Sequence, residues 1–218
     1  MRDAVHTDTA FDSLYALRAE PLPFDRSLLI RAFLLRRDPG NLLIYSTNDL
    51  QGRTAAIADV GGVARHYLNH WHEAMFARER VSAPLFVHEN DSAQAGERTH
   101  VDETFSTRHA VDDDFEAIPI PGHTSGATAF LWENSGHRFM FTGDSIILKE
   151  GRWVAAVLES SDRDSYIKSL ELIRDLDFDV LVPWAATSGH PYHVVTTRAA
   201  ARREIAAILE RVRRGEDQ

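Results

Sequence analysis

The chain has 218 residues, 44% of them hydrophobic, and a formal net charge of −9 at pH 7. It contains no cysteine, which excludes disulfides, thiolate ligands and cysteine nucleophiles, so any metal must be held by His, Asp or Glu. The acidic balance argues against a protein that binds nucleic acid, because that function needs clustered Lys and Arg. The densest basic stretch, residues 198–214, is expected to be the solvated face of a helix.

The sequence has no run of about 18 apolar residues and no targeting segment at its charged, polar start. We therefore expect a cytoplasmic protein with a small-molecule substrate and with neither a membrane nor a nucleic-acid partner. The sequence leaves open whether the protein forms a homodimer. With no repeat, low-complexity tract or Pro/Gly-rich linker, the length suits one domain over residues 1–218.

The first half of the chain alternates apolar runs with turn signals. Residues 28–35 form a nearly unbroken apolar run and residues 42–45 a second one. They flank an Asp-Pro-Gly-Asn turn at residues 38–41, which predicts a hairpin of buried strands. A helix, two strands and a helical turn are predicted next, over residues 48–58, 63–68, 83–88 and 91–95. Such alternation is typical of α/β layers.

The second half is predicted to hold strands, a hairpin and two helices. The hairpin turns at Asn134-Ser135-Gly136, and its second strand leads into Thr142-Gly143-Asp144. Apolar residues at helical spacing predict a helix over residues 162–176. The other predicted elements are strands over residues 115–120 and 180–182 and a last helix over residues 197–213.

Three histidines and one carboxylate are predicted to lie at strand ends. His70 and His72 follow the strand over residues 63–68, where an i, i+2 pair can reach one ion if the chain turns. Alone, this pair is weak support for a metal site. His123 in a glycine-framed loop and Asp144 after a later strand strengthen it, because imidazoles plus a carboxylate suit Zn²⁺ or Fe²⁺.

These motifs resemble the metallo-β-lactamase-fold hydrolases, especially the glyoxalase II-like members. The resemblance spans residues 28–185 and is carried by Asn41-Leu42-Leu43-Ile44, Leu68-Asn69-His70-Trp71-His72, Ile120-Pro121-Gly122-His123-Thr124-Ser125-Gly126 and Phe141-Thr142-Gly143-Asp144-Ser145. It implies an α+β fold, the four-layer αββα sandwich, with metals where strand-end loops meet. It also implies that His70, His72 and His123 are ligands of one metal and that Asp144 is the carboxylate bridging a pair.

The departures from the family pattern fall on one metal. Where the first motif of the family reads His-x-His-x-Asp-His, this chain has Ala74 and Met75 in place of the Asp and the last His. Ala185 stands where the family has a final histidine ligand. In a dinuclear member these three positions serve the second metal, so we expect a mononuclear site.

Four other residues leave alternatives open. His190 or His193 could restore a second metal if a longer loop returns to the site, and His88 is better interpreted as a strand-end histidine with a backbone partner. Glu73 could be a solvated carboxylate or a stand-in general base, since the aspartate that handles the proton of water in the family is replaced by Ala74.

The leading hypothesis is a hydrolase that uses one Zn²⁺ or Fe²⁺ to activate water against an ester, thioester or lactam carbonyl. Asp144 and Glu73 are the candidate catalytic carboxylates. The rival interpretation is a catalytically inactive binding or regulatory protein with one structural metal or none. A third is an iron protein that handles oxygen or sulfur.

Overall fold

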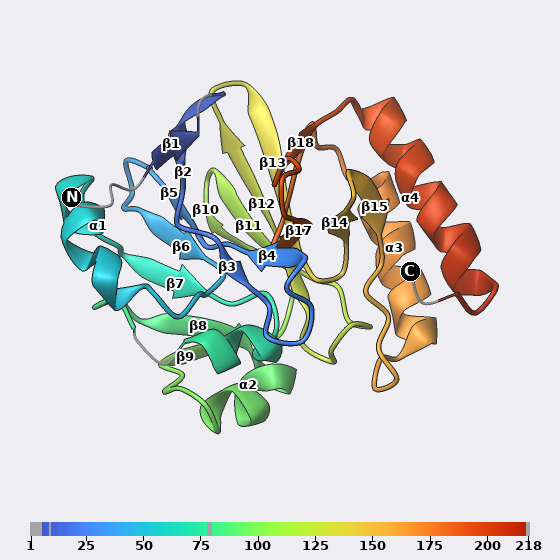
Figure 1. Ribbon diagram of the computed structural model, residues 1–218, viewed down its shortest axis with the longest axis horizontal. Helices are drawn as coiled ribbons and strands as arrows, with labels where there is room; N and C mark the ends of the chain where they lie inside the picture. Colours follow the sequence, from blue (N-terminus) through green and yellow to red (C-terminus); the bar gives the residue numbers. More distant parts are fainter. Residues whose placement is uncertain (1–5, 9, 78–79, 217–218) are drawn as a thin grey trace. The chain divides into compact units, whose positions relative to one another are not determined.

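The computed structural model describes residues 6–8, 10–77 and 80–216 (Figure 1). The chain divides into two compact units between Phe105 and Ser106. Within the described residues, no helix combines the length and the apolar character needed to cross a bilayer. The expectation of one domain over residues 1–218 stays a prediction.

The first unit is built on a seven-stranded mixed sheet (Figure 1). Its strand order is β1 (His6–Asp8), β2 (Phe11–Ala16), β5 (Phe33–Leu35), β6 (Leu42–Ile44), β7 (Arg65–Tyr67), β8 (Leu85–His88) and β9 (Glu103–Phe105). The pairs from β1 to β6 are antiparallel, and those from β6 to β9 are parallel. β3 (Glu20–Pro21) pairs antiparallel with β4 (Leu28–Ile30).

The predicted hairpin exists, but its first strand is shorter than the apolar run. β5 and β6 pair antiparallel, and Gly40 in their turn has a φ of 112°, which a glycine adopts without strain. The run over residues 28–35 is divided into β4, which pairs with β3, and β5, which pairs with β6; between them Arg31 donates a hydrogen bond to the Leu17 carbonyl. The helix predicted over residues 48–58 begins later, as η1 (Gln51–Arg53) and α1 (Thr54–Asp59).

The parallel strands of this sheet deliver the first histidines. After β7 the chain runs through Leu68 and Asn69 into η2 (Trp71–Phe76), a 3₁₀ helix, and after β8 it enters α2 (Glu89–Gly96). Loops at the carboxyl ends of parallel strands are where open α/β sheets place their ligands. The predicted strand ends over residues 63–68 and 83–88 are thereby confirmed.

The second unit contains a six-stranded sheet in the order β10 (His109–Asp112), β11 (Phe115–Pro119), β12 (Thr128–Asn134), β13 (His137–Gly143), β16 (Val180–Pro183) and β18 (Val194–Val195). β14 (Ile147–Lys149) pairs with β15 (Arg152–Val154) and with β17 (Ala185–Thr187). Helices α3 (Arg163–Asp175) and α4 (Arg198–Arg213) lie side by side and share one apolar core with these strands (Figure 1).

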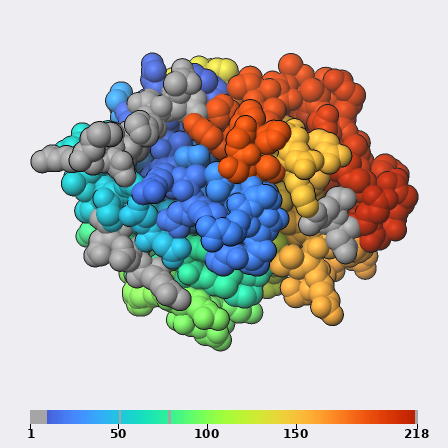
Figure 2. All heavy atoms as spheres, in the orientation of Figure 1, coloured from blue at the N-terminus to red at the C-terminus, as the bar shows by residue number. Residues whose placement is uncertain are grey.

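The predicted elements of this unit are confirmed with small shifts in their bounds. The β12–β13 turn has positive φ at Ser135 and Gly136, as a tight hairpin requires. Helix α4 is capped by the Thr197 hydroxyl, which accepts from the Ala200 N–H. Its outer face lies at the surface of the second unit, where Arg202 and Arg213 pair with acidic residues of α3, so the basic stretch is a solvated helix face (Figure 2).

Candidate metal centre

His70 and His72 are positioned by the abrupt change from strand to 3₁₀ helix after β7. His70 is the N-cap residue of η2, with an extended backbone (φ −156°, ψ 163°), whereas His72 lies inside the helix. The change of backbone direction brings their ring centroids to 5.0 Å with an interplanar angle of 87°. His70 is fully buried and His72 is half-buried, so the pair lies in a largely dry environment.

Glu73 holds this turn together from within. Its Oε1 atom accepts hydrogen bonds from the backbone N–H groups of Asn69 (3.0 Å) and His70 (3.3 Å). The same oxygen is 3.0 Å from His70 Nδ1, and both side chains have no exposed area. The sequence motif contains this residue, but its contact with His70 becomes visible only in the folded turn.

The helical repeat of η2 assigns its side chains to different faces. In a 3₁₀ helix residues i and i+3 are eclipsed, so Met75 shares the face of His72. His70 precedes the helix as its N-cap, and Glu73 reaches back to it in a capping box. Ala74 shares the face of Trp71, and both pack into an apolar cluster completed by Leu68, Leu85, Val87 and Ala95. The position that holds aspartate in the resembled family is therefore part of a hydrophobic core here.

His123 lies in the loop between β11 and β12 and is fixed by the segment that leads into α3. Its Nδ1 atom is 2.7 Å from the Ala156 carbonyl, and its own carbonyl accepts from the Ser161 hydroxyl at 3.1 Å. Gly122 has a φ of 145°, and a Cβ atom there would lie 2.4 Å from the Tyr166 Cα. Only glycine fits at this approach of loop to helix.

Asp144 follows β13 and faces His123. Its Oδ2 atom is 3.8 Å from His123 Nε2, and its side chain is 16% exposed. Beneath it the Tyr166 hydroxyl donates to the Ser145 carbonyl at 2.8 Å and to the Asp144 carbonyl at 3.3 Å. Burial, and then the charge of Asp144, raises the pKa of Tyr166 well above its usual value, so this hydroxyl stays a neutral donor.

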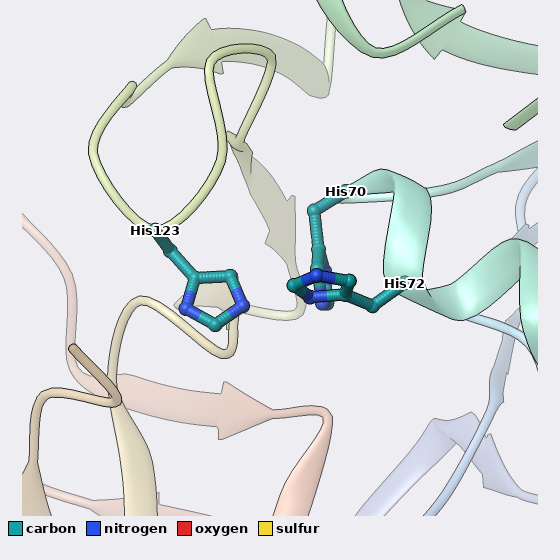
Figure 3. A group of neighbouring side chains, drawn as sticks. All are labelled: His70, His72 and His123. Atoms are coloured by element: carbon teal, nitrogen blue, oxygen red, sulfur yellow. The ribbon is translucent and has the colours of Figure 1, made fainter. Parts of the chain in front are cut away.

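Among the described residues, His70, His72 and His123 are the one group of three ligand-type side chains that could hold a metal ion. One nitrogen from each lies within 4.8 Å of the other two (Figure 3). Asp144 is outside this group, although it contacts one member. His88 caps α2 by accepting from the Asn90 N–H, which confirms its interpretation as a strand-end histidine with a backbone partner.

The two loop histidines considered for a second metal do not join a three-ligand group in the part of the chain that the structure describes. His190 is exposed after β17, and the ring of His193 packs against that of Tyr192 at a centroid distance of 5.1 Å.

The motifs of the site lie within a match to a known protein family. A profile described as the Metallo-beta-lactamase superfamily matches residues 52–185, which include both histidine motifs and Asp144. The chain belongs to the metallo-β-lactamase superfamily. A search of curated protein sequences found no match.

Several solved structures share its fold. The Rm3 metallo-β-lactamase is 14% identical, with a TM-score of 0.63, and the match covers 94% of this chain and 93% of that one. BJP-1, a subclass B3 metallo-β-lactamase of Bradyrhizobium japonicum, is 13% identical, with a TM-score of 0.61 over 93% and 90% of the two chains. ETHE1 from Myxococcus xanthus is 18% identical, with a TM-score of 0.57 over 89% and 90%.

These likenesses confirm the predicted fold class, an α/β sandwich with several mixed sheets and flanking helices. As a member of the metallo-β-lactamase superfamily, the chain retains a three-histidine group that could hold a metal ion, typical of zinc-dependent members. Sequence patterns predict all three histidines. They do not reveal the supporting groups, the Ala156 carbonyl and the Tyr166 hydroxyl, because these come from segments without a motif.

Proposed function

We propose that the chain is a glyoxalase II-like, metal-dependent hydrolase that binds one Zn²⁺ or Fe²⁺ ion through His70, His72 and His123. The observation that carries this proposal is the convergence of three imidazole nitrogens within 4.8 Å in a member of a hydrolase superfamily. Three protein ligands with an open position are the usual arrangement of a catalytic zinc site.

The protonation of the histidines supports this assignment. A carbonyl oxygen only accepts hydrogen bonds, so the contact with Ala156 places the proton of neutral His123 on Nδ1. Oε1 of Glu73 likewise accepts from the ring of His70, which places the proton of neutral His70 on Nδ1. Each ring then keeps its Nε2 lone pair for a metal, which neutral imidazole donates to Zn²⁺ or Fe²⁺.

The bound ion would supply Lewis acidity that polarises a carbonyl and lowers the pKa of water. Asp144 is the better placed of the two candidate carboxylates to accept a proton from water. Its side chain is 16% exposed and faces His123, whereas Glu73 is fully buried and its Oε1 is occupied by three donors. The substrate class we propose is an ester, thioester or lactam.

The geometry of η2 supports a single ion. Ala74 lies in an apolar cluster. Met75 is on the same face of η2 as His72, but its side chain offers only a weakly coordinating thioether. Ala185 is buried at the start of β17 and has no ligand atom in its side chain. The positions that would serve a second ion are therefore apolar.

Elemental analysis of protein purified without added metal tests the proposal. We expect about one metal ion per chain, lost in His123→Ala and retained in His109→Ala, because His109 lies outside the three-histidine group and its ring contacts the nearby Thr107 carbonyl. Two ions per chain would contradict the mononuclear site. A panel of thioester, lactone and β-lactam substrates then tests the activity, with Asp144→Asn as the control expected to lose turnover but keep the metal.

A catalytically inactive binding protein is the second candidate. The burial of Ala74 in an apolar cluster favours it, because the resembled family uses an aspartate at this position to handle the proton of water. Metal binding without turnover of any substrate in the panel, and with the same result for Asp144→Asn, would select this second candidate.

A further inference from the structure

Glu73 makes one more contact, with the His70 ring, than a residue that only caps a helix would make. A capping carboxylate at the start of a helix normally accepts from backbone N–H groups. Here Oε1 accepts from the backbone of Asn69 and His70, and also receives the His70 ring at 3.0 Å. Both side chains are fully buried, so water does not compete for this bond.

We propose that Glu73 is a positioning residue that fixes His70 as an Nε2 ligand of the metal; this inference rests on the proposed function. Oε1 already accepts from two backbone N–H groups and accepts from the ring as well, so neutral His70 carries its proton on Nδ1. The bond also fixes the rotation of the ring about its side-chain torsions. Nε2 therefore carries no proton and is held in one orientation. The negative charge of Glu73 makes this nitrogen a stronger metal ligand.

The capping geometry at the start of η2 explains why residue 73 has this role. His70 is the N-cap residue and Glu73 is the third residue of the helix, the position from which a side chain reaches back to the N-cap, whereas residue 74 packs in the apolar cluster. The acidic residue of this motif therefore supports a ligand of the proposed ion from behind. This arrangement assigns Glu73 to metal affinity and not to proton transfer with substrate.

The test compares zinc affinity in the wild-type protein and in Glu73→Gln by competition with a chromophoric chelator. The substitution keeps the size of the side chain and an oxygen that can accept from the same backbone groups, but it removes the charge. We expect zinc to bind roughly 10- to 100-fold more weakly, the usual effect of removing a hydrogen-bond partner of a ligand. Circular dichroism checks that the variant is folded.

Glu20→Gln is the matched control. The Glu20 carboxylate also accepts from two backbone N–H groups, those of Asn48 and Asp49, and it belongs to β3, which carries none of the three histidines. This variant should keep the zinc affinity of the wild type. A similar loss in both variants would overturn the proposal, because it would show a general effect of losing a capping charge.

A second readout needs no metal. Long-range ¹⁵N–¹H spectra of the metal-free protein report which nitrogen of His70 is protonated, and we expect Nδ1–H in the wild type and a loss of this single form in Glu73→Gln. An Nε2–H form in the wild type, or equal zinc affinity of wild type and variant, would refute the positioning role alone. Failure of the wild type to bind zinc would instead refute the proposed function. The spectra of the metal-free protein would still test whether Glu73 fixes the proton of His70 on Nδ1.

Discussion

Gly122 and Tyr166 touch backbone to backbone: a Cβ atom on Gly122 would lie 2.4 Å from Tyr166 Cα and 2.6 Å from its N atom. This contact locks the loop of His123 against the first turn of α3. The position of one proposed ligand therefore depends on a glycine that touches no ligand atom itself.

Substitution Gly122→Ala should destabilise the protein by about 2 kcal/mol or more, because it combines a clash with backbone and a strained positive φ. Urea unfolding measures this. Gly136→Ala is the matched control: its φ is +81°, but an added Cβ meets nothing within 4 Å, so it should lose only the strain energy. Equal losses of unfolding free energy in the two variants would show that the close approach of Gly122 to Tyr166 does not contribute to stability.

The hydroxyl of Tyr166 supports the strand end that carries Asp144. Tyr166→Phe leaves the Ser145 carbonyl without its side-chain donor and should cost about 1–2 kcal/mol of unfolding free energy. Tyr15→Phe serves as the comparison, since that hydroxyl accepts a long hydrogen bond of 3.4 Å from Arg36 and its loss should cost less. If thermal and urea unfolding rank the two variants in the opposite order, the proposed support is absent.

Restoring the aspartate of the family motif should not restore a second metal. In Ala74→Asp the new carboxylate would enter an apolar cluster, which should lower stability by roughly 3 kcal/mol or more. Ala93→Asp, on the exposed side of α2, should be nearly neutral. A stable Ala74→Asp protein that binds two ions per chain would be incompatible with the burial described for this position.

His66 should make stability depend on pH. Its Nε2 is 2.7 Å from the Tyr45 carbonyl, and burial lowers its pKa from the usual 6.5 to about 4. The unfolded chain therefore binds a proton at higher pH than the folded chain. The contribution of His66 to stability is full above pH 6.5 and is lost as pH falls toward about 4, a loss of up to about 3 kcal/mol.

Urea unfolding of wild type and His66→Gln between pH 4 and 7, with chelator present in both, checks this dependence. The free energy of unfolding should fall more steeply with decreasing pH in the wild type than in the variant. Identical slopes would mean that His66 is protonated in the folded protein over the same range as in the unfolded one.

Strand-end chemistry is the part of the site that the sequence could predict. His70 and His72 follow an apolar strand, His123 is framed by glycines, and these signals are local. The structure confirms each placement. The contact of Glu73 could not be predicted in the same way, because only the folded start of η2 shows that its side chain reaches back to His70 and not toward solvent.

Long apolar runs and weak strands account for the differences in the fold. The apolar run over residues 28–35 is broken in the sequence only by Arg31, yet in the structure it forms two strands, of which β4 pairs with β3 and β5 pairs with β2 and β6. Strand β2 was not predicted because its exposed Asp12 and half-buried Ser13 break the apolar pattern, although β2 pairs with β5. Tertiary pairing, which acts across distant segments, decided both cases.

The coordination of the metal tests the central claim most directly. Protein given two equivalents of Zn²⁺ and then desalted would be measured by X-ray absorption at the zinc edge. We predict about three imidazole ligands on a single class of zinc and no zinc–zinc scattering. A metal–metal vector at roughly 3.5–4 Å, the spacing of two-metal hydrolytic sites, or fewer than two imidazoles per zinc, would contradict it.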